Sequence, residues 1–565
     1  MNTLAHRGPD QWGDLFEKGV YLGHRRLSIL DLSPLGRQPM TDITGQVSIT
    51  VNGEIYNYKE LKKDLQNTHH FISHSDSEVL LHGYRNWGVE MLLNKIDGMF
   101  AFCIYDKAQQ KIYLARDHTG IKPLYYAVIG DIIAWASELK AIESFFGKNN
   151  LEVDQTALYD FLTYRYVPTP KTLFKNVWKL EPAHYLEIDL NKNKTQKYNY
   201  WKLTPANQTI SRDDARNHLK QLIKQSVTNQ LISDVPLGFF LSGGIDSSVI
   251  VSEAAHISQQ VHTYSIGFDV KQHDETHFAE LIAAQFKTQH HSKVLDKYSA
   301  QGMFDKLKSW YDEPFADTSA FPTFLVCEFA KEHCTVVLTG DGGDEVFGGY
   351  SSYFRFKELI EHRNQKPFLT MLFFLAEDKI KRHWSGRFNR KVYAHILSDE
   401  VELFAYIRGR MLKPAKIMYK TMFQIPEEYD DYWHFRRYYI RELPLLTRLQ
   451  YLDFHTLLPD DILTKVDRVS MAVGLEARVP LLSKDIIEFS FSLPEDVRFC
   501  NNTLKGLLKY AYNDTLPSEI LHRKKKGFSI PVKSWGKTLL NRYNTAEEFI
   551  LRTIYAEELR SAAWK

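Results

Sequence analysis

The sequence has little cysteine, almost no excess charge of one sign and no long apolar run. Only four cysteines, Cys103, Cys327, Cys334 and Cys500, occur in 565 residues, and their spacing does not suit a metal site. We therefore expect a reducing, cytoplasmic setting. The balance of 71 Lys and Arg against 69 Asp and Glu argues against a general affinity for nucleic acid or acidic membranes. The longest strongly apolar run, at 368–376, is under half the roughly 20 residues of a membrane span, so we expect neither a transmembrane segment nor a signal peptide.

The length predicts two or three domains. From 47 to 138 the pattern is typical of strands and hairpins with one inserted helix at 77–88, which indicates a layered α+β domain. A Tyr-, Asn- and Thr-rich stretch at 197–211 is interpreted as a linker. After it, strands alternate with helices, which predicts a parallel α/β sheet covered on both faces, and 351–459 is predicted to be a helical extension.

The segment FFLSGGIDSS, at 239–248, joins a predicted strand to a predicted helix. Gly243 and Gly244 let the backbone approach a ligand, and the serines lie at a helix N-terminus, where unpaired N–H groups favour an anion. The segment lacks the Lys and the spacing of a Walker loop. We interpret it as a phosphate-binding turn in which Asp246 needs a cation such as Mg²⁺ beside the phosphate.

A second glycine loop, LTGDGGDEVFGGY at 338–350, also follows an apolar strand and carries Asp341, Asp344 and Glu345. In a doubly wound sheet both loops lie at the carboxyl ends of strands, where ligands bind. The two acidic loops together predict a Mg–ATP site.

SGGIDSS resembles the signature of N-type ATP pyrophosphatases, which cleave ATP between the α and β phosphates. With the second loop, DEPFADTSAFP at 312–322, the segment 460–482 and RKKKGFSIP at 523–531, it resembles the synthetase domain of the glutamine-hydrolysing asparagine synthetases. The resemblance implies a synthetase domain over 205–565. There the side-chain carboxylate of aspartate attacks ATP to give β-aspartyl-AMP and pyrophosphate, and ammonia then displaces AMP. Such a domain must chiefly shield charge and exclude water.

The resemblance also implies roles for individual residues. Asp246 and Asp344 hold Mg²⁺, and Lys525 neutralises phosphate charge. Asp341, implied to be catalytic, stands where many members have Glu, which is one methylene longer. The other implied ATP-binding residues are Phe240, Leu241, Ser242, Gly243, Gly244, Ser247, Ser248, Ile266, Thr339 and Gly340.

Two acceptors stay open. The first is aspartate; the second is a sugar carboxylate, because TGDGGDE and DEPFAD also resemble a branch that often amidates sugars of surface polysaccharides. A non-catalytic remnant is a third hypothesis, against which the paired acidic loops argue. We expect small-molecule ligands, no nucleic acid and no membrane, and the sequence leaves a homodimer open.

Residues 1–200 have their own motifs: HRGPD at 6–10, GHRRLSILD at 23–31, VNGEIYNY at 51–58, SDSE at 75–78 and ARDHTGIKPLYY at 115–126. In this order they resemble the class II glutamine amidotransferase domain, an N-terminal-nucleophile hydrolase of αββα layers. The resemblance implies that Arg26 binds the glutamine carboxylate and that Glu54 and Asp76 bind its amino group. Asn52 and the Gly53 N–H are implied to form the oxyanion hole.

The nucleophile of that family is a Cys exposed as residue 1, with its own α-amine as the base. No such Cys is present in the sequence, and Cys103, in a predicted strand, is expected to be buried. We therefore expect a truncated first domain without glutamine hydrolysis and a synthetase that uses free ammonia. Either translation begins upstream of this Met, or the gene has lost the start of its glutaminase domain.

Overall fold

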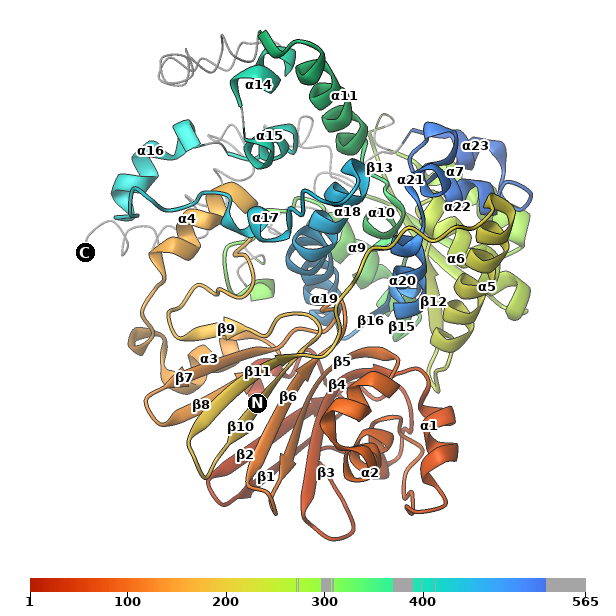
Figure 1. Ribbon diagram of the computed structural model, residues 1–565. Coiled ribbons are helices and arrows are strands. Elements are labelled where there is room, and N and C mark those ends of the chain that lie inside the picture. Colours follow the sequence, from red (N-terminus) through yellow and green to blue (C-terminus); the bar gives the residue numbers. More distant parts are fainter. Residues whose placement is uncertain are drawn as a thin grey trace.

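The computed structural model describes residues 1–524, except 271, 273, 296–305, 307, 308, 369–389, 398 and 412. It has two parts, drawn in Figure 1 with the N-terminal one in red to yellow below the C-terminal one, which runs from yellow through green to blue. In the part of the chain that is described, no helix is both long and apolar enough to cross a membrane. The apolar run at 368–376 lies, beyond Phe368, outside the described residues.

The N-terminal part is built on a six-stranded sheet in the order β11-β10-β6-β5-β4-β3, in which all neighbours are antiparallel. Its strands are β3 (Met40–Thr41), β4 (Val47–Ile55), β5 (Gly98–Asp106), β6 (Lys111–Arg116), β10 (His184–Asp189) and β11 (Lys194–Asn199). A second β layer holds β1 (Gln11–Glu17), β2 (Val20–Arg26), β7 (Tyr125–Ile129), β8 (Ile132–Ala136) and β9 (Val177–Lys179). The helices are α1 (Tyr58–Leu65), α2 (Ser77–Lys95), α3 (Leu139–Phe146) and α4 (Gln155–Tyr164), with 3-10 turns η1 (Asn2–Leu4), η2 (Pro34–Gly36) and η3 (Lys148–Asn150).

Successive side chains of β5 point into two different cores, and this gives the order of the layers. Phe100 and Phe102 face a core shared with α1 and α2, whereas Ala101 and Cys103 face a core shared with β2. Helix α3 packs on the outer side of β7 and β8. The layers therefore run α, β, β, α, as predicted. Cys103 is buried, as expected, and its burial raises the pKa of the thiol.

Three local predictions need correction. The segment 47–138 holds a second helix, α1, besides the one predicted inserted helix. Helix α2 extends beyond the predicted 77–88, with a kink at Gly88, whose φ is +74°. Residues 197–199, assigned to the linker, instead complete β11, because they continue the antiparallel pairing with β10. The connection between the two parts therefore starts at Tyr200.

The C-terminal part is built on a parallel five-stranded sheet in the order β14-β13-β12-β15-β16. Its strands are β12 (Leu237–Phe240), β13 (His262–Phe268), β14 (Gln289–Leu295), β15 (Val336–Leu338) and β16 (Glu476–Arg478). Helices α5 (Arg212–Gln230), α6 (Ile245–Ile257) and α7 (Thr276–Phe286) share one core with it, and α9 (Ala320–Lys331) and α19 (Thr464–Met471) share another. Both faces are covered, as predicted.

Strand order places the ligand-binding edge of this sheet. From β12 the chain moves outward through β13 and β14, then returns to the other side of β12 as β15. The order reverses between β12 and β15, and the crevice beyond their carboxyl ends is where ligands bind in such sheets. Both acidic glycine loops leave from these two strands, as predicted.

The segment 351–459 is helical wherever it is described, as predicted, apart from its connections. It contains α11 (Ser351–Gln365), α14 (Arg390–Ile396), α15 (Glu400–Ile407), α16 (Lys413–Met422), α17 (Trp433–Tyr438) and α18 (Leu445–His455). The remaining elements are the π-helix η4 (Leu458–Leu463), the helices α10 (Gly343–Phe347), α20 (Lys484–Ser492), α21 (Glu495–Arg498), α22 (Gly506–Ala511) and α23 (Ser518–His522), and the turns η5 (Pro480–Leu482) and η6 (Cys500–Asn502).

A buried ion network joins the two parts. Arg7 of the HRGPD motif donates to both carboxylate oxygens of Asp467 on α19, at 2.8 and 2.9 Å, and to Glu138 at 2.9 Å. Arg468, the next residue of α19, pairs with Glu138 at 3.1 Å and with Asp312 at 3.3 Å. All these groups are buried, so each charge depends on its partners.

We predict that Asp467→Ala lowers the free energy of unfolding by roughly 3–5 kcal/mol, because it leaves the Arg7 guanidinium buried without its bidentate partner. Chemical denaturation of the full chain, followed by tryptophan fluorescence, measures this. The control is Glu152→Ala, which breaks an exposed pair with Lys175 and should change stability little. Equal stability of Asp467→Ala and wild type would show that the network does not hold the two parts together.

Candidate functional site

The first glycine loop turns sharply from β12 into α6. Gly243 has φ +65°, and a Cβ there would lie 2.4 Å from the Cβ of Phe278, so only glycine fits. The Ser242 backbone N–H donates to Ser247 Oγ at 3.3 Å, and Ser247 Oγ donates to the Gly244 carbonyl at 3.1 Å. The Ser247 hydroxyl thereby closes the turn at the N-terminus of α6, the geometry that favours an anion.

The second glycine loop packs directly on the first. A Cβ at Gly340 would lie 2.8 Å from both the Asp246 Cβ and the Ser247 nitrogen, and a Cβ at Gly343 would lie 2.6 Å from Asp246 Oδ1. The Asp341 N–H donates to Thr339 Oγ1 at 3.1 Å, and this hydroxyl donates in turn to the Asp341 carboxylate. Glycines at these positions bring the acidic side chains of both loops together.

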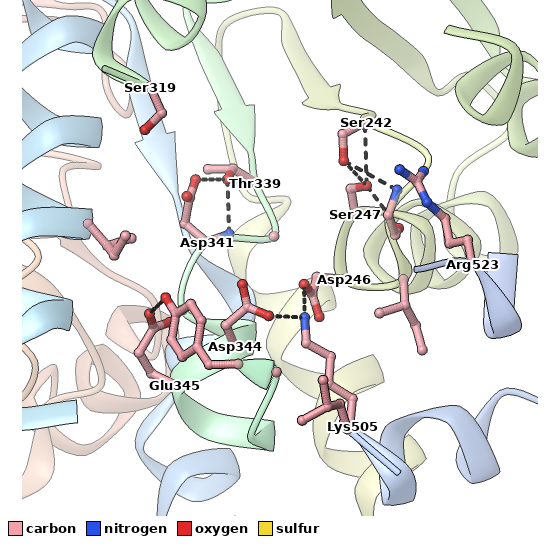
Figure 2. Close-up of a pocket in the computed structure, with 18 of the residues that line it drawn as sticks. Ser242, Asp246, Ser247, Ser319, Thr339, Asp341, Asp344, Glu345, Lys505 and Arg523 are labelled. Carbon is pink, nitrogen blue, oxygen red and sulfur yellow. Dashed lines mark hydrogen bonds and ion pairs between the residues drawn. The ribbon is translucent and has the colours of Figure 1, made fainter. Parts of the chain in front are cut away.

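Asp246 and Asp344 converge on one cation, the ammonium group of Lys505. The Lys505 Nζ lies 2.6 Å from Asp344 Oδ1 and also donates to Asp246 Oδ2 (Figure 2). Burial by itself lowers the pKa of Lys505, but the two carboxylates outweigh it and hold the pKa above its ordinary value. The sequence interpretation missed Lys505, because the dipeptide Lys-Gly before a short helix carries no recognisable motif.

The two carboxylates fit Mg²⁺. This ion is commonly held by one or two carboxylates with substrate phosphates and water completing its shell, and here both reach the same cation position. Among the described residues no cluster of three or more His, Cys, Asp or Glu side chains is arranged to hold a metal. Phosphate oxygens or water would complete the shell of a metal held here by Asp246 and Asp344.

The loops open into a cavity of about 1150 Å³. Most of the predicted ATP-binding residues line it: Phe240, Leu241, Ser242, Gly244, Asp246, Ser247, Ile266, Thr339 and Gly340, with Asp341 and Asp344. Two do not. Gly243 turns the backbone behind the loop, where its carbonyl accepts from Arg523 at 2.7 Å, and Ser248 is fully buried in α6. Lys525 lies outside the described residues.

One end of the cavity carries a lysine that the sequence interpretation did not single out. Lys465 of α19 donates to Ser319 Oγ at 3.0 Å and pairs with Asp317 at 3.4 Å, two residues of the DEPFADTSAFP segment. Although burial lowers it, the neighbouring Asp317 and Asp341 raise the pKa of Lys465 to about 12, so the group is cationic at neutral pH. Asp341 lines the cavity together with Lys465, so this end carries one acidic and one basic side chain.

The five predicted glutamine-binding residues line a second, smaller cavity of about 110 Å³: Arg26, Asn52, Gly53, Glu54 and Asp76. Arg26 is held there by the carbonyls of Leu30 and Asp31, at 2.7 and 2.8 Å. Gly53 has φ +136°, and a Cβ there would lie 1.9 Å from the Met99 carbonyl oxygen, so glycine is required.

The carboxylates of this cavity favour a cationic ligand. Burial raises the pKa of Glu54, and the nearby Asp76 raises it further. Burial likewise raises the pKa of Asp76. An ammonium group between two such carboxylates would relieve both costs. No cysteine is among the residues lining the cavity, and all four cysteines are buried elsewhere.

We predict that Gly343→Ala weakens MgATP binding by roughly a hundredfold, because the added methyl group displaces the Asp246 carboxylate. Isothermal titration calorimetry with MgATP measures the affinity. Gly130→Ala is the control for a methyl group added away from the site: its Cβ would meet nothing within 4 Å, although its φ of +59°, unlike that of Gly343, is itself unfavourable for alanine. If Gly343→Ala bound MgATP as wild type does, the contact between the two loops would not set the geometry of the acidic pair.

Two family models match the chain. The model described as asparagine synthase matches residues 218–553, and the model described as a glutamine amidotransferase domain matches residues 1–201. These spans agree with the two parts of the fold.

Named relatives match over nearly the whole length. The chain is 35% identical over 556 residues to asparagine synthetase [glutamine-hydrolyzing] 1 of Bacillus subtilis (strain 168), covering 96% of this chain and 85% of that protein. It is 30% identical to asparagine synthetase [glutamine-hydrolyzing] 3 of the same organism, covering 97% and 88%. It is 27% identical to amidase chry2 of Gibberella zeae, covering 95% and 85%. On these matches, and on the two glycine loops described above, the chain belongs to the glutamine-hydrolysing asparagine synthetase family of carbon–nitrogen ligases.

Proposed function

We propose that this protein amidates aspartate to asparagine at the expense of ATP, through β-aspartyl-AMP, with release of AMP and pyrophosphate. The convergence of Asp246 and Asp344, from two glycine loops at the switch point of a parallel sheet, carries the proposal. Such a pair is suited to a metal bound to phosphates, and at this edge of the sheet the ligand is a nucleotide.

Different residues along the cavity are proposed to bind different parts of MgATP. Ser242, Ser247 and the Gly244 N–H bind the β and γ phosphates at the start of α6. Phe240, Leu241, Ile266, Thr339 and Gly340 contact the adenosine. Mg²⁺, when held by Asp246 and Asp344, neutralises and orients the pyrophosphate group. Lys525, by its match to the family motif, adds a cation to the phosphates.

The acceptor carboxylate binds at the end that carries Asp341, Ser319 and Lys465. Lys465 is the cation suited to attract a carboxylate, and Asp317 keeps it in place. Asp341 is held by Thr339, and we assign it to formation of the acyl-adenylate.

A sugar carboxylate is the second candidate acceptor. Asp341 is one methylene shorter than the Glu of many members, and this leaves more room at the acceptor end than the longer side chain would. The relative named amidase chry2 carries a name that does not refer to asparagine.

The nitrogen donor is proposed to be ammonia for a polypeptide of this sequence. The residues around the smaller cavity suit glutamine, but the lining offers no thiol, and the pKa of Cys103 is raised by burial. The buried, unpaired thiols also support a cytoplasmic location.

We expect aspartate, and not a uronic acid, to trigger release of pyrophosphate from MgATP. A coupled pyrophosphate assay with a panel of carboxylates measures this. Asp246→Ala should lower the rate roughly a hundredfold or more, because the phosphate charge loses its shielding, while circular dichroism stays unchanged. Pyrophosphate release with uronic acids alone would support the second candidate instead.

We also expect ammonium chloride to support amide formation with MgATP and aspartate, and glutamine not to support it. Chromatography of the amino acids measures product and any glutamate formed. Glutamine as effective as ammonium, with stoichiometric glutamate, would contradict the proposal that this polypeptide lacks a glutaminase.

A further inference from the structure

We propose that Lys505 occupies the metal position of the nucleotide-free protein, so that the Asp246–Asp344 pair accepts a divalent cation only together with its nucleotide. The inference rests on the proposed function in one respect, the assignment of these carboxylates to Mg²⁺. It adds a role for a residue that no motif identifies.

The contacts of Lys505 are those of a bound cation. Its Nζ bridges one oxygen of Asp344, at 2.6 Å, and one of Asp246, and Figure 2 shows the three side chains meeting at one point. The side chain is 7% exposed. The ammonium group therefore stands where a metal held by both carboxylates would stand.

The backbone packs tightly around Asp344 and Lys505. A Cβ at Gly349 would lie 1.9 Å from Asp344 Oδ1 and 2.4 Å from Lys505 Cε. Lys505 itself has φ +54°, at the N-cap of α22, and its N–H lies 3.4 Å from the Gly348 carbonyl oxygen. The loop before α22 is thus fastened to the second glycine loop, and the lysine reaches the pair from a fixed point.

Electrostatics favour Lys505 over a free metal ion. A divalent cation arriving alone would have to displace an ammonium that already has both carboxylates, and two carboxylates are a sparse shell for Mg²⁺. The displaced ammonium would remain beside the incoming charge.

A triphosphate removes both obstacles. Its oxygens complete the metal shell, and its negative charge gives the Lys505 ammonium a new partner within reach of its flexible stem. The exchange moves Lys505 from the carboxylates to the phosphates, so metal and nucleotide enter as one complex. When they leave, Lys505 returns and keeps the two carboxylates from repelling each other.

The test measures metal binding directly, with Mn²⁺ alone as the probe and the electron paramagnetic resonance signal of free Mn²⁺ as the readout, on the full chain. Without nucleotide, wild type should bind Mn²⁺ at the pair too weakly to detect, whereas the dissociation constant of Lys505→Met should be at least roughly tenfold lower than that of wild type. With ATP and no acceptor, wild type should bind the Mn²⁺–ATP complex; because ATP also binds Mn²⁺ in free solution, this arm is measured as Mn²⁺ and ATP retained together by the protein in equilibrium dialysis. Lys509→Met is the matched control: it removes a charge from the same helix and should stay as wild type without nucleotide.

The double variant Lys505→Met/Asp246→Ala shows where the metal goes, since binding by Lys505→Met must be lost when Asp246 is removed. Nucleotide-independent Mn²⁺ binding by wild type, equal to that of Lys505→Met and sensitive to Asp246→Ala, would overturn the inference and leave the metal assignment standing. Failure of every variant and of wild type to bind Mn²⁺, even with ATP, would overturn the metal assignment itself. Should Lys505→Met not fold, the wild-type comparison with and without ATP decides: binding only with ATP supports the inference.

Discussion

Two carboxylates held close together at the edge of a parallel sheet require a positive charge between them, and much of this protein is arranged around that requirement. Asp246 lies in the first turn of helix α6, whose N-terminus favours anions, and Asp344 lies in the short helix α10. Under the proposed function, the start of α6 that favours a nucleotide's phosphates thus carries an acid that would repel them. A cation makes the two demands compatible.

The glycines follow from this constraint. The two loops approach so closely that a methyl group at Gly340 or Gly343 would collide with Asp246. Backbone without side chains is the means by which loops separated by about a hundred residues of chain share one site. The switch in strand order between β12 and β15 makes the approach possible, because no other strand lies between them.

The fold was largely predictable from the sequence, because its signals are local. The strand-rich pattern of 47–138 predicts the strands of the first part, and the alternation of strands and helices after the linker predicts the parallel sheet of the second. Boundaries were less predictable: residues 197–199 are polar and resemble a linker, yet they pair with β10 because an edge strand can be exposed on both sides.

The residues of the candidate site were likewise only partly predictable from the sequence. Residues within the glycine loops and around the glutamine cavity were predicted, and most of them meet as expected. Ser248 was placed on the cavity by its motif, but helical periodicity turns it into the core. Lys505 comes from a segment without a motif, and Lys465 lies within the 460–482 motif but was not singled out there; the folded chain brings both lysines to the acids of distant loops.

Helix α19 connects the two parts of the chain through neighbouring side chains. Lys465 and Asp467 are two residues apart on this short helix. Lys465 lines the larger cavity, whereas Asp467 binds Arg7, which lines the smaller one. The two parts of the chain are therefore not interchangeable modules. A chimaera that joins the first part of one relative to the second part of another keeps this buried junction only if both parents have this match of arginine and aspartate.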